Sequence, residues 1–382
     1  MNATLVGHTC LDCAAELAPS ADRCEQCGGP LEPHYDVGPD PVTTAPTRSM
    51  WEVGAPLPAG DAPVTLGEGA TPLVSCPAVA ADVGVGSVLV KDEGRNPTGS
   101  VHDRGMSVAL SVARSRGSSE VRLPATGVEG QAAAAYAGRA GIDCRVAVPT
   151  RAPFLAKAMV NVHGADMRVV QGRYPAALET AGGWSTGWSL APMATPYRVE
   201  GAKTLAYELL AQLPAAPDTV VVPCGAGETL LGVARGFQEL VAAGSLEAVP
   251  SLVAAQAAGC APIVDALATD EQTPAVLEHP DTICGAIEIP DPPAGTLGMA
   301  AVRESGGTGV TATDASTLEA AVTLAAHEGV ALAPSAGVAV AILSTLREAG
   351  QLADDDTVVV IGTVGGRVAA DVLRSHLMGQ GI

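Results

Sequence analysis

The chain alternates between short runs of apolar residues and longer stretches in which apolar residues recur every three or four positions. The short runs predict β-strands, and the longer, alanine-rich stretches predict α-helices. Strands are expected at 87–90, 120–124, 144–148, 167–170, 219–222, 251–255 and 357–361. Helices are expected at 104–116, 130–140, 153–163, 205–212, 229–243, 315–327 and 336–349. Strands that alternate with helices form βαβ units, so the pattern predicts an α/β fold with mostly parallel sheets.

Residues 31–62 show little periodicity and are rich in proline, aspartate and threonine. We therefore expect a linker, or an arm that wraps the body of the protein. The chain shows no internal repeat and no coiled-coil pattern. Ligands of open parallel sheets bind beyond the carboxyl ends of the strands. The residues that follow each predicted strand are therefore the first place to look for chemistry.

The length of 382 residues predicts two or three domains, and an apolar fraction of 47% is enough for large cores. There are 41 acidic and 21 basic side chains, which gives a formal net charge of −20. This charge repels phosphates, so we expect neither nucleic acid nor an anionic membrane as a partner. No apolar run reaches the roughly 18–20 residues of a membrane span. The amino terminus also lacks the features of a signal peptide, so a cytoplasmic protein is expected.

Lysine is scarce: the chain contains only Lys91, Lys157 and Lys203. An excess of carboxylates with few lysines is typical of proteins that work in concentrated salt, where ions screen the repulsion. A halophilic source is therefore one hypothesis. An acidic protein from a GC-rich organism is the alternative.

Four of the nine cysteines lie within the first 27 residues, as two CxxC pairs formed by Cys10 with Cys13 and Cys24 with Cys27. Two such pairs can supply four thiolates to one tetrahedral zinc ion. A site closed by four protein ligands has a structural role. The sequence thus predicts a small zinc ribbon over residues 1–35. Two redox-active pairs, or a site without metal, are the alternatives.

Several glycine-rich strings lie at the junctions between predicted strands and helices. Taken singly, each could be a set of turns and helix caps. In order, they are GEGATPL at 67–73, KDEGRNPTGSVHDRG at 91–105, PYRVEGAKT at 196–204, PCGAGE at 223–228 and APSA at 333–336. In this order, and with the cysteine pairs in front, the chain resembles the threonine synthases, which are fold-type-II pyridoxal-phosphate (PLP) enzymes.

The resemblance implies a two-domain architecture like that of the tryptophan synthase β-subunit, behind the zinc ribbon. Residues 36–103 and 204–382 would form the larger α/β domain, and residues 104–203 a smaller inserted α/β domain. The implied reaction converts O-phosphohomoserine to threonine with PLP, and relatives eliminate ammonia from serine or threonine. Relatives are often dimers, so a homodimer is expected on the same grounds.

The residue that would form the Schiff base with PLP departs from the family pattern. The family has a lysine in the string NPTGSFKDR, and this chain has His102 at that position. Imidazole has no primary amine, so it cannot take the place of the lysine, although it can move protons. The three lysines all fall on other positions of the family pattern, so we expect no displaced substitute.

The positions that would contact the cofactor depart as well. Val128 stands where the family has an asparagine, and we interpret it as core filling. The phosphate loop is Gly225, Ala226, Gly227 and Glu228, in which the carboxylate would repel a phosphate or take its place. An ordinary acidic residue at a helix start is the alternative interpretation of Glu228. The family has a hydroxyl residue that contacts the pyridine nitrogen of PLP. Gly362 takes that position in the best register, and Thr363 would take it if the register shifted by one residue.

We therefore expect a threonine synthase-like protein that has lost PLP catalysis, with weak or absent PLP binding. Its cleft, with Ser100, Thr126 and Gly127, would bind a small amino-acid-like or anionic metabolite, or the protein would act as a partner of an active homologue. One alternative is altered chemistry in which His102 and Asp103 act as base and acid. Another is a working PLP-dependent threonine synthase or serine/threonine ammonia-lyase.

Overall fold

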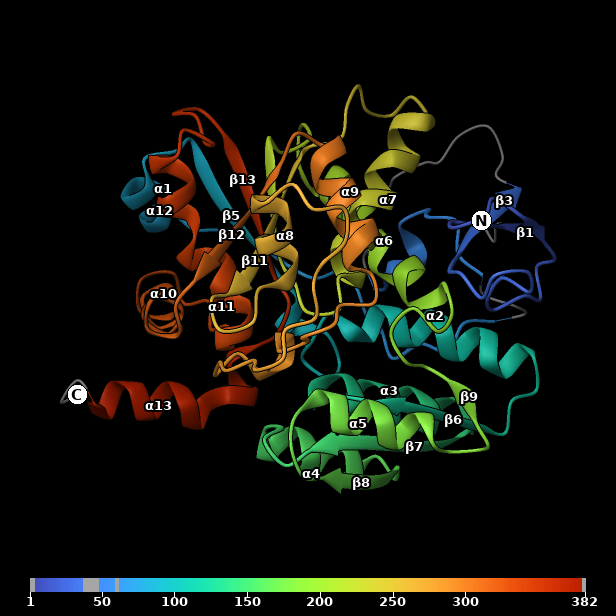
Figure 1. The fold of residues 1–382 in the computed structure, drawn as a ribbon. Helices are drawn as coiled ribbons and strands as arrows, with labels where there is room; N and C mark the ends of the chain where they lie inside the picture. Colours follow the sequence, from blue (N-terminus) through green and yellow to red (C-terminus); the bar gives the residue numbers. More distant parts are fainter. Residues whose placement is uncertain (1–3, 37–47, 59–61, 380–382) are drawn as a thin grey trace.

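The computed structural model describes residues 4–36, 48–58 and 62–379, which form three β-sheets surrounded by helices (Figure 1). The α/β class and the parallel sheets expected from the sequence are confirmed. No helix in these three segments is both long and apolar enough to cross a bilayer.

The first sheet is a small antiparallel ribbon with the strand order β2-β1-β3. Its strands are β1 (Thr4–Cys10), β2 (Glu16–Leu17) and β3 (Leu31–Asp36). The prediction of a linker from residue 31 onward was therefore wrong for 31–36. Leu31 and Pro33 alternate inward along β3, and their burial on the ribbon stabilises the strand. Residues 37–47 and 59–61 of the expected linker lie outside the described residues.

The largest sheet has six strands in the order β12-β11-β10-β13-β5-β4. It comprises β4 (Leu73–Ser75), β5 (Ser87–Asp92), β10 (Thr219–Pro223), β11 (Ser251–Ala257), β12 (Thr308–Ala312) and β13 (Thr357–Gly362). All neighbours are parallel except β4 and β5. The central strands are runs of buried apolar residues, as expected for a sheet covered on both faces. The two edge strands were not predicted, because they are short and only partly buried.

A four-stranded parallel sheet is formed by residues that lie between β5 and β10 in the chain. Its order is β8-β7-β6-β9, with β6 (Glu120–Pro124), β7 (Asp143–Pro149), β8 (Asp166–Val170) and β9 (Trp188–Ser189). In Figure 1 this sheet lies below the six-stranded sheet, with α2, α3 and α6 between them. The carboxyl ends of the two sheets' strands carry the loops that meet at the site described below.

The helices cover the sheets. They are α1 (Pro77–Val83), α2 (His102–Ser115), α3 (Val128–Ala140), α4 (Phe154–Val162), α5 (Tyr174–Gly182), α6 (Tyr197–Gln212), α7 (Glu228–Ala242), α8 (Pro262–Ala268), α9 (Gly295–Glu304), α10 (Asp314–Glu328), α11 (Pro334–Ala341), α12 (Leu343–Glu348) and α13 (Ala370–Gly379). Short 3-10 turns lie at Met50–Glu52, Glu93–Arg95, Gly285–Ile287 and Gly366–Ala369.

Two predicted helices differ from the structure. The helix expected at 205–212 is only the second half of α6, because the first half carries buried charged residues that do not follow an apolar pattern. The helix expected at 336–349 is divided into α11 and α12 at Ile342. Helix α6 packs very closely against α2: a side chain at Gly201 would place its Cβ 2.2 Å from the carbonyl oxygen of Arg104. Glycine is therefore required there for α6 to occupy the centre of the molecule.

Candidate functional site

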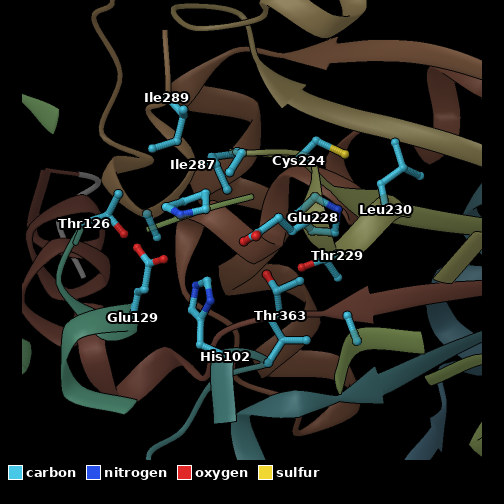
Figure 2. Close-up of a pocket in the computed structure, with 18 of the residues that line it drawn as sticks. His102, Thr126, Glu129, Cys224, Glu228, Thr229, Leu230, Ile287, Ile289 and Thr363 are labelled. Carbon is cyan, nitrogen blue, oxygen red and sulfur yellow. The ribbon is translucent and has the colours of Figure 1, made fainter. Parts of the chain in front are cut away.

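A cavity of about 60 Å³ lies where the ends of strands from the two parallel sheets approach each other (Figure 2). It is walled by the loops after β6, β10 and β13 and by the first residues of α2, α3 and α7. This is the edge at which ligands of parallel sheets bind. The lining includes His102, Thr126, Glu129, Arg198 and Glu228.

His102 begins α2 and lies in the cavity wall. Burial and the neighbouring Arg198 guanidinium lower the pKa of its imidazole to about 3. The side chain is therefore uncharged near neutral pH. Asp103, the next residue, faces away and accepts hydrogen bonds from the Thr98 backbone N–H at 2.7 Å and from the Thr98 hydroxyl. Burial raises the pKa of Asp103 to about 7, and its contacts leave no acid–base pair with His102.

None of the three lysines lines the cavity. The Nζ atom of Lys91 donates to Glu208 Oε2 at 2.6 Å inside the core. Lys203 Nζ donates to Glu200 Oε2 at 2.6 Å, also fully buried. Lys157 Nζ donates to the Thr150 carbonyl at 2.7 Å. All three lysine amines are thus bound to other groups and lie outside the cavity lining.

The glycine-rich loop after β10 lines the cavity with Gly225, Ala226 and Gly227 before α7 begins at Glu228. Gly227 has a φ of +88°, a left-handed conformation that favours glycine. The loop is covered from outside, since the Ala294 N–H donates to the Ala226 carbonyl at 2.9 Å. The sharp turn into α7 that the glycine-rich string predicted is therefore present. The departure expected from the family pattern lies in the next side chain, Glu228.

Glu228 does not point freely at the start of its helix. One carboxylate oxygen accepts from the Met193 N–H at 2.8 Å, and the other lies 2.6 Å from Arg198 Nη2. The same Nη2 lies 2.5 Å from Oε1 of Glu129, at the start of α3. All three side chains are at least nine-tenths buried. We call Glu129, Arg198 and Glu228 the cavity cluster, and it contains two carboxylates for one cation.

Several polar atoms near this cluster have no hydrogen-bond partner within the described part of the chain. They include the hydroxyl of Thr126. The hydroxyl of Tyr174, whose pKa is raised by burial and by nearby Glu129, is a second. Oε1 of Glu129 has the Arg198 guanidinium as its one charged partner, at 2.5 Å. Buried polar atoms are nearly always paired, so such a group of orphans indicates a site for a ligand or water.

The structure brings together only some of the predicted site residues. His102, Thr126, Gly225, Ala226, Gly227 and Glu228 line the cavity. Ser100, Gly127, Val128 and Gly362 are absent from its lining, whereas Thr363 is part of it. Val128 packs in a buried apolar cluster that includes Ala156 and Ile287. Sequence reasoning missed Glu129 and Arg198 as site residues. A signal was available, because Glu129 is the one acidic residue in an alanine-rich stretch directly after a predicted strand.

The cavity does not fit PLP. It offers no lysine amine, and its 60 Å³ is far below the roughly 300–1,000 Å³ of ordinary cofactor pockets. The carboxylate of Glu228 also stands at the helix start where a phosphate would need free N–H groups. The residues present would have to move apart before a cofactor phosphate could be held.

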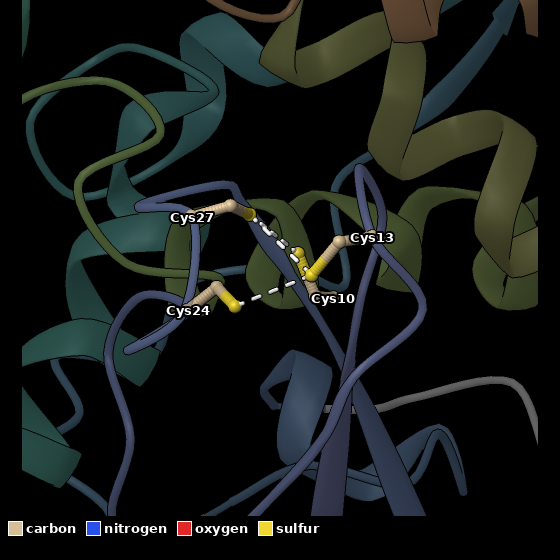
Figure 3. Close-up of side chains that lie close together, drawn as sticks. All are labelled: Cys10, Cys13, Cys24 and Cys27. Carbon is tan, nitrogen blue, oxygen red and sulfur yellow. Dashed lines mark hydrogen bonds between the residues drawn. The ribbon is translucent and has the colours of Figure 1, made fainter.

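The four cysteines of the ribbon do form a compact group (Figure 3). Their sulfur atoms all lie within 4.8 Å of one another, with contacts of 3.5 Å between Cys10 and Cys27 and 3.6 Å between Cys13 and Cys24. Tetrahedral Zn–S bonds of about 2.3 Å need sulfurs roughly 3.8 Å apart. The donor set therefore fits a metal ion of zinc's size and preference.

The ribbon also contacts the segment that walls the cavity. Arg23, next to Cys24, donates from Nε to the Gly28 carbonyl and from Nη1 to the Met193 carbonyl, both at 2.6 Å. Met193 in turn donates its N–H to Glu228. Two hydrogen bonds, joined through the backbone of Met193, thus connect Arg23 of the ribbon to Glu228 of the cavity cluster.

Comparison with known proteins agrees with this architecture. Residues 64–363 match the model of a protein family described as pyridoxal-phosphate dependent enzyme. The chain is 34% identical to a threonine synthase from Methanosarcina acetivorans, over 93% of this chain and 90% of that protein. A threonine synthase from Synechocystis is 36% identical, over 88% of this chain and 89% of that protein.

Solved structures of this fold are more distant in sequence. An L-serine ammonia-lyase from Rhizomucor miehei has a TM-score of 0.70 at 21% identity, over 81% of this chain and 97% of that chain. A diaminopropionate ammonia lyase from Escherichia coli has a TM-score of 0.69 at 18% identity, over 82% of this chain and 88% of that chain.

Proposed function

The chain belongs to the pyridoxal-phosphate dependent enzyme family and is similar to threonine synthases, and we propose that it has lost the covalent chemistry of that family. One observation carries this proposal: no lysine lines the cavity, and each of the three lysines is bound elsewhere. PLP enzymes hold the cofactor as a Schiff base on a lysine amine, which the protein positions at the reacting centre. The imidazole of His102 has no primary amine and cannot form this bond.

What remains is a small polar cavity built on the scaffold of the enzymes. We propose that it binds a small metabolite without converting it. Arg198 and Glu228 would keep the walls in place, and the Thr126 hydroxyl would contact the ligand. The second possibility that we propose is that the protein acts as the binding partner of an active homologue.

The proposal is tested by adding PLP to the purified protein, recording the visible aldimine band and reducing with borohydride. We expect no band and no reduced lysine adduct by peptide mapping. The threonine synthase from Methanosarcina acetivorans, treated identically, is the positive control. A stoichiometric adduct on any of the three lysines would overturn the proposal.

A single substitution sharpens the test. We expect His102→Lys to fold but to gain no visible PLP band, because Val128 and Glu228 are unchanged and the cavity stays small. Tight PLP binding by this variant would show that only the amine had been lost. It would contradict the proposed degradation of the phosphate site.

Altered chemistry at His102 is not favoured as a second function. Asp103 is engaged by Thr98, and the lowered pKa of His102 leaves it a very weak base. If any activity is found, its persistence in His102→Ala would remove this alternative altogether.

We further propose that the four clustered cysteines bind one structural zinc ion. The purified protein should contain close to one zinc per chain by elemental analysis, and Cys24→Ser should lose it. Cys144→Ser is the matched control, because Cys144 is a buried cysteine far from the ribbon in sequence, on β7. Zinc well below one per chain in the unaltered protein would refute the site.

We also propose a cytoplasmic location in a halophilic organism. None of the nine cysteines is paired in a disulfide, as is usual in a reducing compartment. A melting curve should move upward in molar KCl, because salt screens the repulsion within a chain of charge −20. An unchanged or lowered melting temperature would favour the alternative of an acidic protein that does not depend on salt.

A further inference from the structure

The cavity cluster leaves an unbalanced charge inside the protein. Arg198 lies against both Glu129 and Glu228, at 2.5 and 2.6 Å, so two carboxylates share one guanidinium. His102 in the same wall adds no positive charge near neutral pH, and no lysine is present to do so. A buried charge without a partner is costly, so a site with excess negative charge favours a positively charged ligand.

The two carboxylates are not equivalent. Glu228 accepts a hydrogen bond from the Met193 N–H and lies in the first turn of α7, where the helix dipole favours an anion. Glu129 has only the Arg198 guanidinium beside its Oε1, and no backbone N–H in the described residues donates to it. Glu129 is therefore the carboxylate that is short of a donor.

A second group with the same need lies beside it. Thr126 is 4% exposed and lines the cavity, and its hydroxyl has no partner in the described segments. In Figure 2, the Thr126 hydroxyl and the Glu129 carboxylate occupy the same side of the cavity, opposite Glu228. One carboxylate oxygen and one hydroxyl are acceptors suited to a group that has several N–H donors and a positive charge.

We propose that the cavity binds the ammonium group of a small primary amine, held by Glu129 and Thr126. The cavity of about 60 Å³ has room for an ammonium group, which is about the size of a water molecule. The inference rests on the proposed loss of PLP chemistry, which leaves this space to another ligand.

Two sources share this chemistry: a simple amine and the amino group of a free amino acid. Saturation-transfer NMR on the full-length, metal-loaded protein separates them, with methylammonium and L-serine as probes at constant KCl concentration. Tetramethylammonium has the same charge but no N–H donor, and serves as the control ligand. We expect saturable methylammonium binding and no tetramethylammonium binding. If L-serine binds as well as methylammonium, the ligand is assigned to the amino acids. If only methylammonium binds, the ligand is a simple amine. Both results support the site.

Variants locate the binding. Glu129→Gln should weaken methylammonium binding about tenfold, the effect of removing one charged hydrogen bond, and Thr126→Val should weaken it severalfold. Glu120→Gln is the matched control, because it removes the same charge at the other end of β6 and should leave binding unchanged. If Glu129→Gln fails to fold, Thr126→Val alone decides the matter.

The inference is overturned if methylammonium does not saturate, if tetramethylammonium binds equally, or if both Glu129→Gln and Thr126→Val bind as the unaltered protein does. Such a result without a reduced PLP adduct leaves the proposed loss of PLP chemistry standing. A reduced adduct on a lysine would instead overturn that proposal, so the two failures are distinguishable.

Discussion

Two of the groups of buried charges in the core differ in how completely their charges are compensated. In the first, which we call the balanced cluster, Lys91 and Arg104 face Glu93 and Glu208, with all four side chains fully buried. Its ion pairs have N–O distances of 2.6 to 2.7 Å, so two cations meet two carboxylates. In the cavity cluster, one cation meets two carboxylates, and the nearby Thr126 hydroxyl remains without a hydrogen bond in the described residues.

This difference in charge balance suggests a structural role for the balanced cluster and a binding role for the cavity cluster. The balanced cluster joins β5, α2 and α6 and leaves no space for a ligand, because its charges and donors satisfy one another. The cavity cluster leaves both a charge and a space unfilled. A fold tolerates the second arrangement at a site where a ligand completes it, which is why we place the binding function there.

The largest effect should come from breaking the balanced cluster. Arg104→Met leaves Glu93 and Glu208 buried without their main partner, and we expect it to lower the free energy of unfolding by about 3–5 kcal/mol. Urea unfolding in molar KCl measures this loss. Arg95→Met is the control, since the Arg95 side chain is 66% exposed and its pair with Asp92 should contribute under about 1 kcal/mol. A loss for Arg104→Met no larger than that of the control would contradict the distinction.

Removal of the cation from the cavity cluster should cost less. We expect Arg198→Met to lower the free energy of unfolding by about 2 kcal/mol, because Glu228 can take up a proton and the cavity can admit water. The same urea unfolding measures it. A loss equal to that of Arg104→Met would show that both clusters serve mainly stability.

The two clusters should also respond to pH in opposite directions. Burial alone would raise the pKa of Glu208, but Arg104 and Lys91 lower it from 4.5 to about 2. Its ionised form therefore stabilises the protein above pH 4.5, and this contribution is lost as the pH falls toward 2. Burial raises the pKa of Glu228 despite Arg198. Its ionisation therefore destabilises the protein as the pH rises from 4.5 through the raised pKa.

These signs can be read from two variants whose stability is measured by urea unfolding from about pH 3 to pH 8. The cost of Glu208→Gln relative to the unaltered protein should shrink on acidification below pH 4.5. Glu228→Gln should become more stable relative to the unaltered protein as the pH rises from 4.5, because glutamine removes the ionisation. Equal slopes for the two variants would mean that the clusters do not differ in charge balance.

The smallest effect should come from the contact between the ribbon and the cavity. Arg23→Ala removes the hydrogen bond to the Met193 carbonyl, and we expect a loss of about 1 kcal/mol or less. Hydrogen exchange should become faster in residues 190–200 and at the start of α7, while residues 91–105 of the balanced cluster stay unchanged. Removal of metal by a chelator should give the same local pattern. Equal changes in both regions would indicate general destabilisation instead.

Much of the fold could be predicted from the chain because the patterns that encode it are local. After an initial threonine, the strands β10 and β13 each contain a run of buried valines, and such runs predict central parallel strands without any knowledge of their neighbours. Strand β12 was missed because its residues are glycine, threonine and alanine around one valine, and it is mostly half-buried. The first half of α6 was missed because its buried charges hide the apolar period.

The sequence was sufficient to establish what is missing from the site and what lies at its amino terminus. Only three lysines occur, and the string around His102 predicts that this histidine takes the family's lysine position; both points depend on residue identity alone. The spacing of the four cysteines likewise implied that they could meet, because each pair needs only one tight turn.

Only the tertiary structure decided how the charges are paired. Glu129, Arg198 and Glu228 come from three helices separated by about 30 to 70 residues, and no local pattern relates them. The same holds for Asp103, which turns to Thr98, and for Arg23, which reaches Met193. A charged side chain takes its partner from whatever the packing of helices and loops places within reach. The excess carboxylate in the cavity is therefore a property of the packing, although every residue that forms it is visible in the chain.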